Sequence, residues 1–334
     1  MGGGIWTSDV YEEYERLRAM RGESAFAYDA TLRKRPRDQW VVHPSLDPQW
    51  RNTCGERIRE SRDSDEHPAA TSIAVMFDVT GSMGGIPVVL QQKLPELLGL
   101  LLRKAYVPDP QILFGAVGDA TCDRVPLQVG QFESDNRLDT HLANLVLEGG
   151  GGGQDTESYE LAMYFLARRT VIDSWEKRRK KGYAFFIGDE CAYRAVKRHE
   201  VARLTGDQLT EDIPVRHIVS ELRQRYHMFY ILPKGAAHGG ERKMLDFWRN
   251  LLGQNVLELD DPNAVCETIA LAIGLSEGVI DVDEGAADLA DLSAPATAVH
   301  AARSAVAHLP VLVPVLSAGV LPDDTFHSSG ARRL

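Results

Sequence analysis

Hydrophobic positions follow two alternating patterns along the middle of this chain. Short, uninterrupted apolar runs are typical of strands buried on both faces of a parallel sheet. Between them, apolar residues recur with the period of an amphipathic helix. The runs that predict strands lie at residues 72–79, 111–117, 183–187, 227–232 and 256–259. The helical period covers residues 89–106, 137–147, 157–171, 214–225, 241–252 and 263–273. We therefore expect an α/β fold with a doubly wound, mainly parallel sheet and helices on both faces.

The two ends of the chain lack this alternation. Residues 1–70 are polar and charged, and we expect an N-terminal arm with a short helix that ends at Gly22, followed by a linker at residues 59–70. The tryptophans of the arm are expected to lie on the main domain, residues 71–278. Residues 279–334 begin acidic and alanine-rich and continue into an apolar run that prolines interrupt. There we expect a partly disordered tail with an apolar docking element.

Composition and charge narrow the function classes. Lys and Arg number 37 and Asp and Glu 48, which gives a net charge of −11, and an acidic chain repels phosphate backbones. Nucleic acid is therefore not an expected partner. No apolar run reaches the ~18 residues of a membrane span, and the N-terminus lacks the apolar core of a signal peptide. The four cysteines are scattered along the chain: Cys54, Cys122, Cys191 and Cys266. Free, scattered thiols are typical of a reducing compartment, so we expect a cytoplasmic protein.

Carboxylates end three of the predicted strand segments. Asp78, Asp119 and Asp189 stand within or just after an apolar run. In open parallel sheets, the loops at the carboxyl ends of the strands build the functional site. Asp78 is followed by Thr80 and Ser82, and this alternate spacing in an extended turn directs three oxygens at one point. Hard cations such as Mg²⁺ prefer oxygen ligands, so these three side chains could bind one. The alternative without a metal is that the same oxygens accept hydrogen bonds from backbone N–H groups and cap the turn.

Three segments together resemble a known domain family. Residues 77–83, FDVTGSM, are similar to the DxSxS motif of von Willebrand factor A domains, with Thr80 in place of the first serine. The segments GGGGGQDTESYELAM and FFIGDE resemble the second and third loops of that family, in the same order. The resemblance covers about residues 71–276 and fits intracellular bacterial members best. It implies a metal ion-dependent adhesion site that holds Mg²⁺, with Mn²⁺ or Ca²⁺ as alternatives. The implied ligands are Asp78, Thr80, Ser82, Asp189 and either Thr156 or Glu157.

Two positions of the implied site stay open. The family usually has a threonine in the second loop, five residues before an alanine, and counting back from Ala162 gives Glu157 instead of Thr156. A threonine would leave a more electrophilic ion than a glutamate. Members of the family often carry an acidic residue at the place of Asp119, where it holds a metal-bound water. The alternative is that Asp119 caps its own loop.

The resemblance implies a binding module and not an enzyme. In adhesion sites the metal leaves one position open, which a carboxylate of a partner protein fills. Intracellular bacterial members often work beside AAA+ ATPases, kinases or other components of stress and conflict systems, and these are the expected partners. The alternative is a Mg²⁺-dependent phosphatase of the haloacid dehalogenase type, which also has Asp at the end of its first buried strand. That family needs a second Asp two residues later, where this chain has Thr80.

Overall fold

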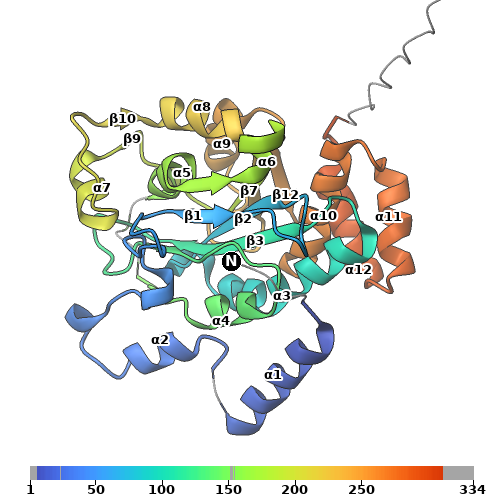
Figure 1. The fold of residues 1–334 in the computed structure, drawn as a ribbon, viewed down its shortest axis with the longest axis horizontal. Coiled ribbons are helices and arrows are strands. Elements are labelled where there is room, and N and C mark those ends of the chain that lie inside the picture. Colours follow the sequence, from blue (N-terminus) through green and yellow to red (C-terminus); the bar gives the residue numbers. More distant parts are fainter. Residues whose placement is uncertain (1–5, 23, 151–152, 154, 311–334) are drawn as a thin grey trace, which may run out of the picture.

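A six-stranded sheet forms the centre of the molecule (Figure 1). The computed structural model describes residues 6–22, 24–150, 153 and 155–310. The strand order is β12-β11-β7-β2-β3-β4, and all neighbours are parallel except β3 and β4. The predicted α/β fold with a mainly parallel sheet is confirmed. The strands are β2 (Thr71–Asp78), β3 (Pro110–Val117), β4 (Leu127–Val129), β7 (Gly182–Ile187), β11 (Tyr226–Pro233) and β12 (Val256–Leu259).

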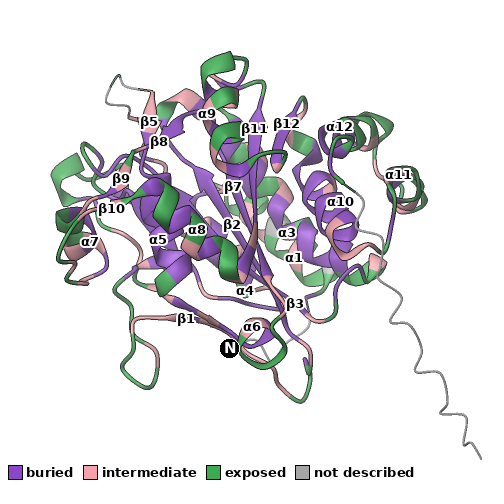
Figure 2. Cartoon of the chain, turned by 90° about the horizontal axis from the view of Figure 1, so that it is seen from above, coloured by how far each residue is buried: buried purple, intermediate pink, exposed green. Residues whose placement is uncertain are grey.

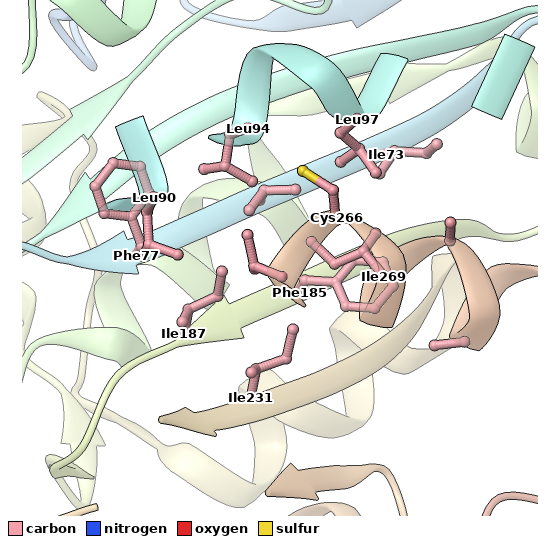
Figure 3. Packing of buried hydrophobic residues seen from close by; sticks show 14 of the residues in the cluster. Ile73, Phe77, Leu90, Leu94, Leu97, Phe185, Ile187, Ile231, Cys266 and Ile269 are labelled. Atoms are coloured by element: carbon pink, nitrogen blue, oxygen red, sulfur yellow. The ribbon is translucent and has the colours of Figure 1, made fainter. Parts of the chain in front are cut away.

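Helices cover both faces of the sheet, because alternate residues of its buried strands point to opposite sides. The main helices are α3 (Ile86–Lys104), α5 (Tyr159–Arg168), α8 (Val215–Arg225), α9 (Arg242–Leu252) and α10 (Val265–Glu277). On β2, Ile73, Val75 and Phe77 pack with α3 and α10, whereas Ala74 and Met76 pack with α5 and α8. Figure 3 shows the first of these layers, and Figure 2 shows how burial concentrates in the strands and in the helix faces against them.

Shorter elements complete the described part of the chain. Two small parallel pairs join β1 (Arg59–Ser61) to β6 and β5 to β8, and β9 pairs with β10 in antiparallel fashion. None of the described helices combines the length and the apolar composition needed to cross a membrane. The bounds are β5 (Thr156–Glu157), β6 (Thr170–Ile172), β8 (Cys191–Ala192), β9 (Ala195–Val196), β10 (Ile213–Pro214), α4 (Arg137–Ala143), α6 (Asp173–Arg178), α7 (Arg198–Leu204), and the 3-10 turns Arg37–Gln39, Pro44–Leu46, Gly81–Met83 and Pro262–Ala264.

The N-terminal arm is part of the packed structure. It contains α1 (Ser8–Arg21), α2 (Ala27–Leu32) and β1 (Arg59–Ser61), and α1 ends at Gly22 as predicted. Trp6 lies against Gly99 of α3, where any β-carbon would collide with the indole. The prediction of a linker at residues 59–70 is wrong, since β1 pairs with β6 and Arg59 is buried. Polar side chains concealed this strand, because a buried arginine breaks the apolar pattern by which strands are found.

Regular structure continues beyond residue 278. The chain forms α11 (Val282–Asp291) and α12 (Ala296–Val306), and Leu289 and Val306 belong to the same hydrophobic cluster as β2. Residues 282–306 of the predicted tail are therefore mainly helical and packed on the domain. Alanines mislead here, because small side chains allow α12 to pack closely on α10 without an obvious apolar stripe. Residues 311–334, with most of the predicted apolar docking element, lie outside the described part of the chain.

Candidate metal centre

The first and third predicted loops meet at one edge of the sheet. β2 ends at Asp78 and its neighbour β7 ends at Ile187, with Phe77 in register with Ile187. Parallel strands place their carboxyl ends at the same edge, so Asp78 and Asp189 come together there. Both aspartates are fully buried, with 0% of their surface exposed. The sheet thus brings together two carboxylates that are far apart in sequence.

A continuous row of oxygen atoms joins these two aspartates. The Thr80 hydroxyl donates to Asp78 Oδ1 at 2.6 Å, Thr80 Oγ1 and Ser82 Oγ lie 3.2 Å apart, and the Ser82 hydroxyl donates to Asp189 Oδ1 at 2.8 Å. Adjacent ligands of an octahedral Mg²⁺, each ~2.05 Å from the ion, are separated by about 2.9 Å. The spacing of the four side chains is therefore close to that of neighbouring oxygen ligands around one hard cation.

The glycine-rich second loop lies directly on the first loop. Gly81 N–H donates to the carbonyl of Gly150 at 2.9 Å, and Gly149 N–H donates to the carbonyl of Val79 at 3.2 Å. A β-carbon at Gly81 would lie 3.1 Å from the Gly150 oxygen and 3.2 Å from the Gly149 oxygen. Such contacts are tight for a carbon atom, and the two backbone carbonyls would have to shift by a few tenths of an ångström to admit it. Gly81 therefore permits the two loops to approach, which holds Thr80 and Ser82 in place.

The structure separates the two candidates of the second loop. Successive residues of β5 point to opposite sides, so Thr156 and Glu157 do not face the same place. Burial first, and then the charges of Asp78 and Glu190, raise the pKa of Glu157 to about 11. Burial also raises the pKa of Tyr193, and a hydrogen bond with Thr156 opposes that rise. Glu157 thus lies near Asp78 and Glu190, whereas Thr156 lies beside Tyr193.

Asp119 organises its own loop. Its Oδ1 accepts from the backbone N–H of Thr121 at 2.8 Å, from the Thr121 hydroxyl at 2.7 Å and from the Tyr193 hydroxyl at 3.0 Å. Its backbone N–H donates to Asp123 Oδ2 at 2.8 Å. These bonds match the loop-capping interpretation, and the charge of Asp119 still acts on Glu157 by raising its pKa. A role in holding a metal-bound water stays a prediction.

Sequence reasoning missed a fourth carboxylate, Glu190, which follows Asp189 directly. Its side chain is 5% exposed, and it forms hydrogen bonds with Ser82 and Glu157 that oppose the rise of its pKa caused by burial and by Asp189. The Oε2 atoms of Glu157 and Glu190 have no hydrogen-bond partner among the described residues. Adjacency to Asp189 was the only signal in the sequence. Buried polar atoms normally have a partner, so these two oxygens are unusual.

Aromatic residues of α5, β11 and α9 form hydrogen bonds to the residues that carry the carboxylates. The Tyr159 hydroxyl donates to Asp78 Oδ2 at 2.7 Å, and the Tyr230 hydroxyl lies 3.4 Å from that of Tyr159. Tyr230 and the Trp248 indole also donate to the carbonyl of Glu190, at 3.1 and 2.9 Å. Tyr230 and Trp248 stack with ring centres 3.8 Å apart. Sequence gives no signal for this network, because buried aromatic residues resemble ordinary core.

The loop after β11 closes the site from the other side. The backbone N–H of His238 donates to Asp189 Oδ2 at 2.9 Å, and the backbone N–H of Ala237 donates to the carbonyl of Ser82 at 3.0 Å. The imidazole of His238 bonds to Glu241, which raises its pKa. Sequence reasoning interpreted His238 as a surface or core residue. Its contribution is a backbone donor, which no side-chain pattern reveals.

The donor set fits a hard divalent cation. Among the residues that the structure describes, Asp78, Glu157 and Asp189 form no ion pair with Lys or Arg, and Glu190 has only His238 Nε2 at 3.9 Å. Burial, and after it the charge of Asp189, raise the pKa of Asp78 to about 7, although hydrogen bonds from Thr80 and Tyr159 oppose the rise. No group of three or more His, Cys, Asp and Glu side chains is arranged to hold a metal within the described ranges. The set therefore depends on the two hydroxyls as well as on the carboxylates.

Comparison with known proteins gives remote structural likenesses. No protein-family model and no curated protein matches the chain. Similar solved structures include the pilus adhesin SpaC from Lactobacillus rhamnosus GG in its open conformation, at 8% identity and a TM-score of 0.45 over 65% of this chain. A von Willebrand factor type A protein from Catenulispora acidiphila gives 12% identity and 0.38, covering 63% of this chain and 43% of that one. The SpRpn10 VWA domain gives 11% identity and a TM-score of 0.32, over 56% of this chain and 85% of that one.

This chain spans 31% of the length of the SpaC adhesin chain. At such identities and TM-scores, the fold assignment depends on the strand order of the sheet and not on these likenesses.

Proposed function

We propose that this chain is a metal-dependent protein-binding module. Its site would hold Mg²⁺, or alternatively Mn²⁺ or Ca²⁺, through Asp78, Thr80, Ser82, Glu157 and Asp189. A carboxylate of a partner protein would complete the coordination. This proposal follows the function that the resemblance of the FDVTGSM segment to adhesion-type sites implies.

Unpaired buried charge is the observation that carries the proposal. Asp78 and Asp189 are fully buried and lack a Lys or Arg partner in the described part of the chain. Burying an uncompensated carboxylate is unfavourable, so a positive charge beside these side chains would stabilise their ionised forms. Bound there, a divalent cation would supply this charge and an open coordination position for a partner's oxygen. Thr80 and Ser82 hold their hydroxyl oxygens in the row that joins the two aspartates.

Three glycines lie beside Ser82 on the surface next to this row. Gly81, Gly84 and Gly85 are exposed, and Ser82 is half-buried between them. Gly84 has φ of 54°, a conformation that L side chains rarely adopt, so the absence of a side chain there is also a backbone requirement. These glycines would leave room for a partner side chain to approach the hydroxyl of Ser82. This geometry suits recognition by a single inserted side chain.

The charges around the site favour an acidic group from the partner. When ionised, the side chains of Asp78 and Asp189 would together balance the two positive charges of a bound divalent cation. The hydroxyls of Thr80 and Ser82 would be neutral ligands, so the donor set carries less negative charge than one made of carboxylates alone. The contact of a partner carboxylate with the bound ion would be charge-assisted and directional.

Phosphatase chemistry of the haloacid dehalogenase type has no support in the site. That chemistry needs a second carboxyl group two residues after the first Asp, as acid and base. Thr80 occupies this place and donates its hydroxyl proton to Asp78 at 2.6 Å. A threonine hydroxyl does not exchange protons near neutral pH as a carboxylate or imidazole does. We therefore propose binding and not catalysis.

Metal-dependent capture of a partner tests the proposal. The immobilised native chain, incubated with extract of its native host, should retain partners in Mg²⁺ and release them in EDTA. Ser82→Ala and Asp78→Ala should abolish retention while thermal unfolding stays cooperative. Ser220→Ala and Asp65→Ala, matched changes at exposed positions, should retain partners as the native chain does. Equal retention in EDTA and by Asp78→Ala would mean that recognition lies on another surface.

A further inference from the structure

The N-terminal arm packs against the chain that leads into the glycine-rich second loop of the proposed metal site. Leu32 and Trp40 of the arm form a separate hydrophobic cluster with Val125 and Val146. Val146 stands three residues before Gly149, whose backbone N–H bonds to the first loop. The arm lies outside the range of the family resemblance, yet it contacts a segment on which the geometry of the site depends.

An ion pair of the arm holds the same segment by its backbone. Asp29 Oδ1 accepts from the backbone N–H of Leu147 at 3.1 Å, and Arg33 Nη2 donates to the carbonyl of Leu147 at 2.7 Å. Asp29 and Arg33 also pair with each other at 2.6 Å. Both backbone hydrogen-bonding groups of Leu147 therefore bind to the arm, which fixes the direction in which the chain enters the second loop.

A second arginine of the arm joins two buried carboxylates. Arg37 Nη2 lies 2.9 Å from Asp123 Oδ1 and 2.9 Å from Glu148 Oε2, and both carboxylate side chains are 0% exposed. Within the described residues, neither acid pairs with another Lys or Arg. Burial raises the pKa of Asp123 to about 6, and the charge of Glu148 adds to this rise, whereas Arg37 opposes it. Carboxylates buried side by side repel each other, so the guanidinium stabilises their ionised forms.

The guanidinium is connected to the first loop through backbone atoms. A β-carbon at Gly150, two residues after the bridged glutamate, would lie 3.0 Å from Arg37 Nη2, so the guanidinium lies directly on this backbone. The Gly150 carbonyl accepts from Gly81 N–H at 2.9 Å. Gly81 stands between Thr80 and Ser82, the two hydroxyl residues of the proposed site. Two short contacts thus separate an arginine of the arm from the proposed ligands.

We propose that Arg37 is a positioning residue of the metal site. By neutralising Asp123 and Glu148 and lying on Gly150, it fixes the second loop, and the bond from Gly81 then determines where the two hydroxyls lie. Its effect on Mg²⁺ affinity rests on the proposed function, whereas its effect on the loop is measurable without metal.

Hydrogen exchange of the native chain and its variants in EDTA tests the loop without metal. In Arg37→Met, the amide of Gly81 should exchange at least about fivefold faster than in the native chain, because its acceptor is no longer held. The amides of β2 should change less, since they report opening of the whole sheet. Arg37→Lys restores a positive charge and should slow the exchange of Gly81 again. Arg35→Met, the same change at an exposed arginine of the same segment, should match the native chain.

Calorimetry with Mg²⁺ separates positioning from a simple effect of charge. Removing a positive charge near a cation site strengthens cation binding, so electrostatics alone predict tighter binding of Mg²⁺ to Arg37→Met. Positioning predicts the opposite, a loss of about fivefold or more that Arg37→Lys partly restores. Arg35→Met should bind Mg²⁺ at least as tightly as the native chain.

The two measurements fail in distinguishable ways. Unchanged exchange of Gly81 in Arg37→Met, or a rise that is equal throughout β2, would overturn the positioning role. If the native chain binds Mg²⁺ and Arg37→Met binds it equally or more tightly, the role is also overturned. A native chain that binds no Mg²⁺, with Gly81 exchange in the expected order, would instead overturn the proposed function, while the hold of Arg37 on the loops stands.

Discussion

In a chain stripped of divalent metal, Asp78 should make the free energy of unfolding fall as the pH rises. The pKa of Asp78 is about 7 in the folded chain, against an ordinary value of 3.8. Between these values the folded state keeps the proton and the unfolded state has released it. Stability then changes by up to about −1.4 kcal/mol per pH unit, and it levels off above the folded pKa. The cause is burial beside Asp189 without a neutralising cation.

Other groups titrate in the same range, so a difference between variants isolates the effect. Asp78→Asn keeps the size of the side chain and removes its titration. His141, whose pKa is lowered to about 4, contributes a change of opposite sign that cancels in the comparison. Urea unfolding in EDTA from pH 4.5 to 8 should show the native chain losing stability relative to Asp78→Asn up to about pH 7. A stability difference that does not depend on pH, or that grows with pH, would refute this reasoning.

Added metal should reverse the trend. Cation binding requires the ionised carboxylate, so the stabilisation of the native chain by Mg²⁺ should increase with pH over the same interval. Asp78→Asn should show a smaller gain that varies little with pH. If Mg²⁺ stabilises the two chains equally at every pH, the ion does not bind at Asp78.

Three substitutions test how the site is held. Gly81→Ala should weaken Mg²⁺ binding in calorimetry, because the new β-carbon would press on two loop carbonyls. The same substitution should lower the free energy of unfolding by about 1–3 kcal/mol in urea. Unchanged Mg²⁺ affinity would show that the contact between the two loops is irrelevant to the site. Glu157→Ala should lower Mg²⁺ affinity by about tenfold or more, whereas Thr156→Ala should have little effect, and the reverse order would restore Thr156 as the ligand. Tyr159→Phe removes the donor to Asp78 and should cost about 1 kcal/mol of stability and up to about tenfold in Mg²⁺ affinity. Tyr164→Phe, which loses a bond to Asp207 instead, is its control and should leave Mg²⁺ affinity unchanged.

The sheet was predictable from sequence because its strands are buried on both faces. β2, β3, β7, β11 and β12 consist mostly of apolar residues, and each was predicted within two residues of its bounds. The meeting of Asp78 and Asp189 followed from this pattern, since parallel strands share one edge. β4 was missed because it has three residues and pairs in antiparallel fashion at the edge. β1 was missed because the charged Arg59 lies where strands usually carry apolar side chains.

The inner layers of the site were not predictable in the same way. Glu190 stands next to Asp189, but only the fold shows that it reaches Ser82 and Glu157. Tyr159 supports Asp78 from α5, and a tyrosine on an apolar helix face looks like core in the sequence. The loop at His238 acts through backbone N–H groups, which every residue except proline has. Side-chain patterns identify ligands, whereas tertiary structure supplies the groups that orient them.

Diffraction from crystals of the native chain soaked in Mn²⁺, with anomalous difference maps recorded, would show directly whether a cation binds at the proposed site. We expect one strong peak at ~2.2 Å from Thr80 Oγ1, Ser82 Oγ and a carboxylate oxygen of Asp78, Glu157 or Asp189. The peak should be absent from crystals of Asp78→Ala that are soaked in the same way. A map without a peak at these residues, or with its only strong peak elsewhere on the molecule, would mean that the proposed metal site is wrong.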